Sequence, residues 1–153
     1  MKSNIQDKLK YEIELQANGN KYIAGVDEVG RGPLAGPVVC ACVIMPLDDL
    51  IDGIDDSKKL SEKKRENLFE LIKEKAVAYS IEFVFEKEID EINILNATKK
   101  CMAKAINNLS VKPDVCLVDA VSGLDTDVEL VSIIHGDALS YNIGAASILA
   151  HNY

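Results

Sequence analysis

The chain has 153 residues, enough for one domain with a substantial core, and 48% of them are hydrophobic, as in ordinary soluble proteins. No apolar run approaches the roughly 20 residues that cross a membrane, and residues 1–10 are too polar for a secretory signal. The net charge of −8 argues against a broadly basic nucleic-acid surface, although metal-binding carboxylates would contribute to it. We expect a cytoplasmic protein.

Helical and strand patterns follow one another along the chain. Residues 5–17 predict an amphipathic helix with Ile5, Leu9 and Ile13 on one side, ended by a turn at 18–20. Strands are predicted at 22–28, 37–45, 76–85, 115–118 and 128–134, and helices at 61–75, 96–109 and 141–150. This order indicates an α/β domain with a mixed sheet. We assign residues 1–20 to an N-terminal helical extension and residues 21–153 to a single domain.

Several side chains in these elements have a predicted place. Ser61 is the expected N-cap of the helix at 61–75, which would bury Leu68, Leu71 and Ile72. In the strand at 76–85, Ile81, Phe83 and Phe85 alternate with other residues and would share one face.

The four cysteines show no metal or disulfide pattern. Cys40 and Cys42 lie two apart in an apolar strand, so they would face the same side, while Cys101 and Cys116 fall in a helix and a strand. There is no CxxC pair, and the two histidines have no zinc-ligand spacing. We therefore expect four buried, reduced thiols.

Three acids stand at predicted strand ends. Asp27 and Glu28 end the first strand, and Asp119 ends the apolar strand at 115–118. Ligands of open α/β sheets bind beyond the carboxyl ends of strands, and hard cations prefer carboxylate oxygens. In a regular strand Asp27 and Glu28 would point to opposite faces, although the glycines that follow suggest a bulge or a strand end. Taken alone, such acids are usually a solvated strand end.

The surrounding motif changes that interpretation. Residues 22–38 read YIAGVDEVGRGPLAGPV, and further segments read DSKKLS at 56–61, INILNAT at 92–98, LVD at 117–119, GDA at 136–138 and AASILA at 145–150. Together they resemble ribonuclease HII over nearly all of residues 22–150. The related ribonuclease HIII differs at the arginine of the glycine turn. A dinucleotide-binding loop is excluded because an extended apolar run, and not a helix, follows the glycines.

The resemblance implies a ribonuclease H-like fold and a metal-dependent endonuclease. Its substrates would be RNA–DNA hybrids and duplex DNA with embedded ribonucleotides, cut on the 5′ side to leave 3′-hydroxyl and 5′-phosphate ends. Asp27, Glu28 and Asp119 would be the catalytic acids and would bind Mn²⁺ or Mg²⁺ in a two-metal mechanism.

The resemblance also implies substrate contacts. Gly30, Arg31 and Gly32 would approach the 2′-hydroxyl that distinguishes RNA from DNA, and glycines leave the backbone amides accessible there. A second set of expected phosphate contacts is Ser57, Lys58 and Lys59.

Four further residues are not assigned to the substrate or the metal. Three of them have two possible roles, and the fourth is expected to be structural. Asn96 and Thr98 are either substrate contacts or helix caps. Asp137, after Gly136, either lies near the site or holds a turn. We expect His135 to be structural, because the family mechanism needs no histidine.

The resemblance stops at residue 150. In the family the last helix continues with Lys and an Arg-Asp pair, and we expect that Asp, beyond Tyr153, to be a fourth catalytic carboxylate. The C-terminal helices would be missing, so an apolar face would be exposed on a chain that is otherwise expected to be a monomer. The alternative function is a catalytically impaired member of the family that binds nucleic acid without cleaving it.

Overall fold

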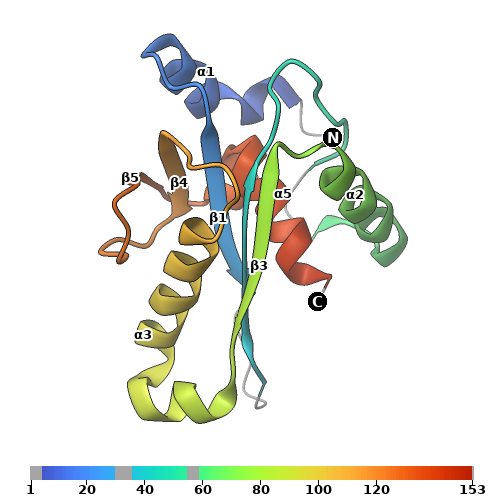
Figure 1. Ribbon diagram of the computed structural model, residues 1–153. Coiled ribbons are helices and arrows are strands. Elements are labelled where there is room, and N and C mark those ends of the chain that lie inside the picture. The colour runs from blue at the N-terminus through green and yellow to red at the C-terminus, as the bar shows by residue number, and fades with distance from the viewer. Residues whose placement is uncertain (1–4, 30–35, 55–58, 153) are drawn as a thin grey trace.

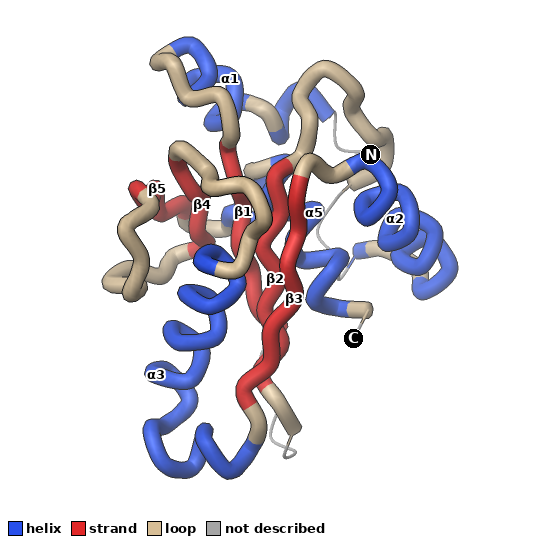
Figure 2. Tube along the Cα trace, viewed as in Figure 1, coloured by secondary structure: helices blue, strands red, loops and turns tan. Residues whose placement is uncertain are grey.

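The computed structural model describes residues 5–29, 36–54 and 59–152 (Figure 1). Its strands form one mixed sheet in the order β3-β2-β1-β4-β5 (Figure 2). The central strand β1 pairs antiparallel with β2 and parallel with β4. The bounds are β1 (Ile23–Val29), β2 (Val38–Ile44), β3 (Ala78–Val84), β4 (Val115–Asp119) and β5 (Glu129–Ile133). The prediction of an α/β fold with a mixed sheet flanked by helices is confirmed.

Helices lie on both faces of this sheet, and Figure 1 shows α3 and α5 on opposite sides of it. The helices are η1 (Ile5–Lys8), α1 (Lys10–Ala17), α2 (Glu62–Lys75), α3 (Glu86–Asn107), α4 (Gly136–Leu139) and α5 (Tyr141–His151). Within the described ranges, no helix is both long and apolar enough to cross a lipid bilayer.

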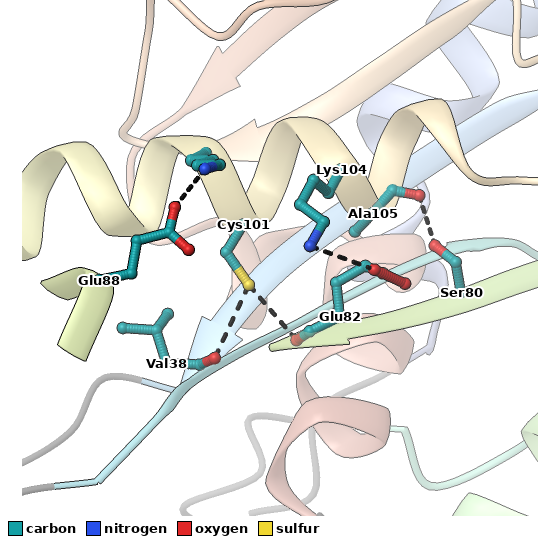
Figure 3. Close-up of polar contacts among 8 residues, drawn as sticks. Val38, Ser80, Glu82, Glu88, Cys101, Lys104 and Ala105 are labelled. Atoms are coloured by element: carbon teal, nitrogen blue, oxygen red, sulfur yellow. Dashed lines mark hydrogen bonds and ion pairs between the residues drawn. The ribbon is translucent and has the colours of Figure 1, made fainter. Parts of the chain in front are cut away.

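Helix α3 is fixed to strands β2 and β3 by an apolar core and by polar contacts (Figure 3). The Cys101 thiol donates to the carbonyl oxygen of Val38 at 3.7 Å and to that of Glu82 at 3.3 Å. The Ser80 hydroxyl donates to the carbonyl oxygen of Ala105, and Lys104 lies 3.9 Å from the Glu82 carboxylate. All four cysteines lie in the described part of the chain as buried free thiols, which confirms the prediction.

Helix α5 packs against the other face so closely that β1 needs a glycine beneath it. A Cβ on Gly25 would lie 2.4 Å from the backbone of Asn142 and of Ile143. The first turn of α5 is also bonded to distant backbone: Asn142 Oδ1 accepts from the amide of Met45 at 2.9 Å, and the Tyr141 hydroxyl accepts from that of Ile51 at 2.8 Å. These contacts set the position of α5 over β1, two residues before Asp27.

The N-terminal helix differs from its prediction. The segment is divided into η1 and α1 at Leu9, so the periodicity that starts at Ile5 does not continue. Leu9 is buried as expected, but Ile13 is 53% exposed and Glu12 takes the buried position. The prediction of a stripe through Ile13 was therefore wrong.

The region around α3 also departs from the sequence pattern. Strand β3 ends at Val84, and Phe85 is an exposed N-cap of α3, which begins ten residues earlier than predicted. A non-helical residue, Asn93, interrupts α3, and its Oδ1 accepts from the amide of Asn96 at 3.0 Å. The cap at this point is thus the side chain of Asn93 and not that of Asn96.

Helix α2 begins and ends where the sequence predicts. Its N-cap is Ser61, whose hydroxyl accepts from the amide of Lys64. Leu68 and Ile72 are buried, whereas Leu71 is 39% exposed. The boundaries and the cap are confirmed, and the burial of Leu71 was wrong.

Candidate metal centre

Two of the predicted acids meet at the carboxyl edge of the sheet. Strands β1 and β4 run parallel, with Val26 opposite Val118, so the next residues, Asp27 and Asp119, come side by side. Both are preceded by buried residues, and the apolar strands therefore place carboxylates where each strand leaves the core. This is the edge at which open α/β sheets bind ligands.

A third acid arrives from strand β5. This strand runs parallel to β4, with Ile133 opposite Asp119, and the chain then turns through His135 in the left-handed conformation (φ 59°). The next residue is Gly136, where a Cβ would lie 3.5 Å from the Asp119 Cα and 2.5 Å from Ile143 Cδ1. A side chain at this position would displace the end of the Ile143 side chain, and the backbone lies in van der Waals range of Asp119. The turn therefore delivers Asp137, in the first turn of α4, to the ends of β1 and β4.

The three aspartates form one cluster. Carboxylate oxygens of Asp27, Asp119 and Asp137 all lie within 4.8 Å of one another. Asp27 is buried and the other two are half-buried, so the cluster is open to solvent on one side. An all-oxygen set of this kind, with no histidine or cysteine in it, suits Mg²⁺ or Mn²⁺ better than zinc.

The electrostatics of Asp27 show why a cation fits there. Burial is the main cause that raises the pKa of Asp27 well above its usual range, and the negative charges of Glu28, Asp119 and Asp137 raise it further. One opposing contact is the amide of Glu28, which donates to Asp27 Oδ1 at 2.9 Å and lowers the pKa. A divalent cation would replace this repulsion by attraction and stabilise the ionised form.

Glu28, the remaining predicted ligand, does not belong to this cluster. Strand β1 is regular across it, with Glu28 opposite Cys40 and Val29 opposite Val39, so no bulge interrupts the described part of the strand. The regular alternation turns Glu28 toward the α3 face, opposite to Asp27. Its charge still raises the pKa of Asp27, so Glu28 borders the centre. Its role as a ligand stays a prediction.

Asp137 is the residue that the sequence analysis left undecided. The interpretation as a turn residue and the interpretation as a site neighbour both describe it, because the turn at His135 carries it into the cluster. A signal was present in the sequence: Asp137 comes shortly after strand β5, and Asp119 is the last residue of strand β4. The cluster thus contains an acid that the sequence analysis did not assign to it.

The predicted substrate contacts lie largely outside the described residues. These are Gly30, Arg31, Gly32, Ser57 and Lys58, while Lys59 is described and exposed. The role of all six residues in substrate binding stays a prediction.

Known proteins share this sequence and this fold. Residues 24–153 match the sequence model of the family described as ribonuclease HII. The chain belongs to the ribonuclease HII family. A ribonuclease HII from Acetivibrio thermocellus is 55% identical over 140 residues, which are 92% of this chain and 55% of that protein. The chain thus spans about half the length of the curated ribonucleases HII that it matches. The resemblance found in the sequence is confirmed.

Two archaeal crystal structures have the same fold. The ribonuclease H2 from Pyrococcus horikoshii is 30% identical with a TM-score of 0.75, and the match covers 86% of this chain and 71% of that one. The ribonuclease HII of Archaeoglobus fulgidus, solved in complex with PCNA, is 30% identical with a TM-score of 0.74 and covers 86% and 72%. The fold of this chain is therefore that of a type 2 ribonuclease H.

Proposed function

We propose that this chain carries the catalytic acids of a metal-dependent ribonuclease H. Its reaction is hydrolysis of the RNA strand of RNA–DNA hybrids, and cleavage on the 5′ side of ribonucleotides embedded in duplex DNA. The products carry 3′-hydroxyl and 5′-phosphate ends. The observation that supports this most is the cluster of Asp27, Asp119 and Asp137 at the strand ends of a ribonuclease HII family member.

The donor set fits a hard divalent cation. Asp27, Asp119 and Asp137 would hold it, since their oxygens converge within 4.8 Å and the repulsion among them needs a positive charge. A bound Mn²⁺ or Mg²⁺ would supply Lewis acidity toward the phosphodiester and a lowered pKa for water. The family resemblance implies two cations, and the stoichiometry of Mn²⁺ binding tests that number.

The residues of this chain have distinct tasks around that centre. Asp27 and Asp119 sit on adjacent strands of the buried sheet, so their separation is fixed by backbone pairing and not by flexible loops. By the family resemblance, Gly30, Arg31 and Gly32, which follow β1 in the sequence, would meet the 2′-hydroxyl next to the scissile phosphate. Lys59, together with Ser57 and Lys58, would bind phosphates of the substrate.

A nicking assay tests the proposal. The purified chain is incubated with Mn²⁺ and a DNA duplex that contains one ribonucleotide, beside Asp119→Asn and a matched control, Asp125→Asn. Asp125 is exposed on a loop and loses the same charge on substitution. We expect cleavage 5′ to the ribonucleotide by the wild type and by Asp125→Asn but not by Asp119→Asn.

The other results identify the alternatives. Binding of the duplex without any cleavage, by protein whose circular dichroism shows it to be folded, would favour the member of the family that has lost catalysis. Equal cleavage by all three proteins would mean that Asp119 is not in the catalytic centre.

A further inference from the structure

A second acid is buried at the beginning of α5, far from α5 in the sequence. Glu12 of α1 is 0% exposed. Its Oε2 accepts hydrogen bonds from the Ser140 hydroxyl at 2.7 Å, from the amide of Asn142 at 2.9 Å and from Asn142 Nδ2 at 3.2 Å. The carboxylate thus binds the beginning of α5, about 130 residues away along the chain.

Lys8 binds a residue of α4 that is nearer to Asp137 in the sequence than Ser140 is. Its side chain is 2% exposed, and Nζ donates to the carbonyl oxygen of Ala138 at 2.7 Å. Ala138 directly follows Asp137. The N-terminal segment therefore holds the short α4 at Ala138 through Lys8 and the α4–α5 junction at Ser140 through Glu12.

The junction transmits this restraint to Asp137. Ser140 is both the C-cap of α4 and the N-cap of α5: its amide donates to Gly136 at 2.7 Å, and its hydroxyl accepts from the amide of Ile143 at 3.2 Å. Helix α4 has four residues, so Asp137 is within one turn of this fixed point. A shift of Ser140 would move Asp137 relative to Asp119.

Burial of the Glu12 carboxyl group costs free energy that packing alone does not explain. Burial raises the pKa of Glu12, and its Oε1 is buried without a hydrogen-bond partner within the described residues. An apolar side chain would fill the same space without that penalty. What an apolar side chain would not supply is a single oxygen that orients three donors at the start of α5.

We propose that Glu12 is a positioning residue for the metal centre: through Ser140 and Asn142, and with Lys8 at Ala138, it holds Asp137 against Asp27 and Asp119. This inference rests on the proposed function for its cation, but the restraint itself belongs to the metal-free chain.

The affinity for Mn²⁺ gives one test, measured by calorimetry on the full chain well below its unfolding temperature. Loss of a residue that orients a metal ligand typically weakens binding about 10- to 100-fold, and we expect that for Glu12→Ala. Glu12→Gln keeps an oxygen acceptor of the same reach and should recover most of the affinity. Glu14→Gln, an exposed acid on the same helix, is the matched control. Folded Glu12→Ala protein with the affinity of Glu14→Gln would overturn the proposal.

Hydrogen exchange of the metal-free chain gives a second test that does not depend on a cation. We expect faster exchange at the amides of Ala138, Leu139 and Ser140 in Glu12→Ala and in Lys8→Met, relative to amides of β2 in the same protein. If Glu12→Ala does not fold, Lys8→Met carries the comparison, and Glu12→Gln is the variant that should behave like the wild type. Unchanged exchange at these amides would overturn the positioning role. A wild-type chain that binds no Mn²⁺ would instead refute the proposed function and leave the exchange result to decide this inference.

Discussion

Two buried carboxylates lie beside the α4–α5 segment, and their surroundings are of opposite kind. Glu12 is surrounded by hydrogen-bond donors, three of which converge on one oxygen. Asp27 is surrounded by acids, and a single amide opposes them. Burial raises the pKa of both groups, but hydrogen bonds lower that of Glu12 again whereas neighbouring charges raise that of Asp27 further.

This difference separates a carboxylate that positions its neighbours from one that would bind the cation itself. Three donors bind Oε2 of Glu12 within the protein, so removal of the carboxylate should weaken the fold. The environment of Asp27 is unfavourable within the protein alone, and becomes favourable only when a cation joins it. Burial of Glu12 and burial of Asp27 therefore predict different results when each carboxylate is removed, and experiments can distinguish them.

The largest expected effect is on catalysis. Asp27→Asn removes a buried carboxylate from the cluster, and we expect cleavage of the ribonucleotide-containing duplex to fall by about a thousandfold or more. The metal-free variant should be more stable than the wild type, because it removes a buried charge and the repulsion of that charge with Glu28, Asp119 and Asp137. Steady-state nicking and urea unfolding in EDTA measure the two effects. A variant that loses stability and keeps activity would reverse the assignment of Asp27.

Mn²⁺ should stabilise the folded chain. At a free concentration of 100 times Kd, a cation that binds only the native state adds about 2.7 kcal/mol to the free energy of unfolding. We expect this gain in the wild type and its loss in Asp119→Asn, with Asp125→Asn as the control. Thermal unfolding with and without Mn²⁺ measures it. A gain that persists in Asp119→Asn would place the cation elsewhere.

Removal of the Glu12 side chain should have the opposite effect on the metal-free fold from removal of the Asp27 charge. Glu12→Ala leaves the Ser140 hydroxyl and two donors of Asn142 buried without their acceptor, at a cost of about 1–3 kcal/mol. Glu12→Gln should lose less, and Glu14→Gln should be unchanged. Urea unfolding in EDTA checks the order, and a stabilised Glu12→Ala protein would contradict it.

The smallest effect concerns pH. A carboxyl whose pKa is higher in the folded state binds its proton more readily there, so the stability it contributes is full below the ordinary values of 3.8 for Asp27 and 4.5 for Glu12. That stability is lost as the pH rises through the raised values. We expect the metal-free chain to lose stability from about pH 4 upward, and Asp27→Asn and Glu12→Gln each to show a weaker dependence. Identical pH profiles for the wild type and both variants would contradict this.

Much of the fold could be predicted because its elements have strong local signals. The apolar runs of β2 and β4 and the cap at Ser61 fix strands and a helix close to their observed bounds. The early start of α3 was missed because its first ten residues carry acids and the interruption at Asn93, which weaken the apolar periodicity. The exposure of Ile13 was missed because the break at Leu9 changes the phase of the helix.

The candidate site was predictable only in part. Asp27 and Asp119 follow from the rule that strand ends carry ligands, since each ends an apolar strand. Asp137 could not be assigned in the same way, because its place depends on the left-handed turn at His135 and on the close approach of Gly136 to Asp119. Glu12 gave no signal at all, because only tertiary structure brings it to Ser140.

The most direct test of the central claim is calorimetric titration of Mn²⁺ into the wild-type chain, Asp137→Asn and Asp125→Asn. Asp137 is the acid that the sequence left undecided and the structure brings into the cluster, so it tests the geometry of the site. We predict that the wild type and Asp125→Asn bind Mn²⁺ alike and that Asp137→Asn binds it at least about tenfold more weakly. Equal binding by all three proteins would contradict the view that Asp27, Asp119 and Asp137 form one metal centre.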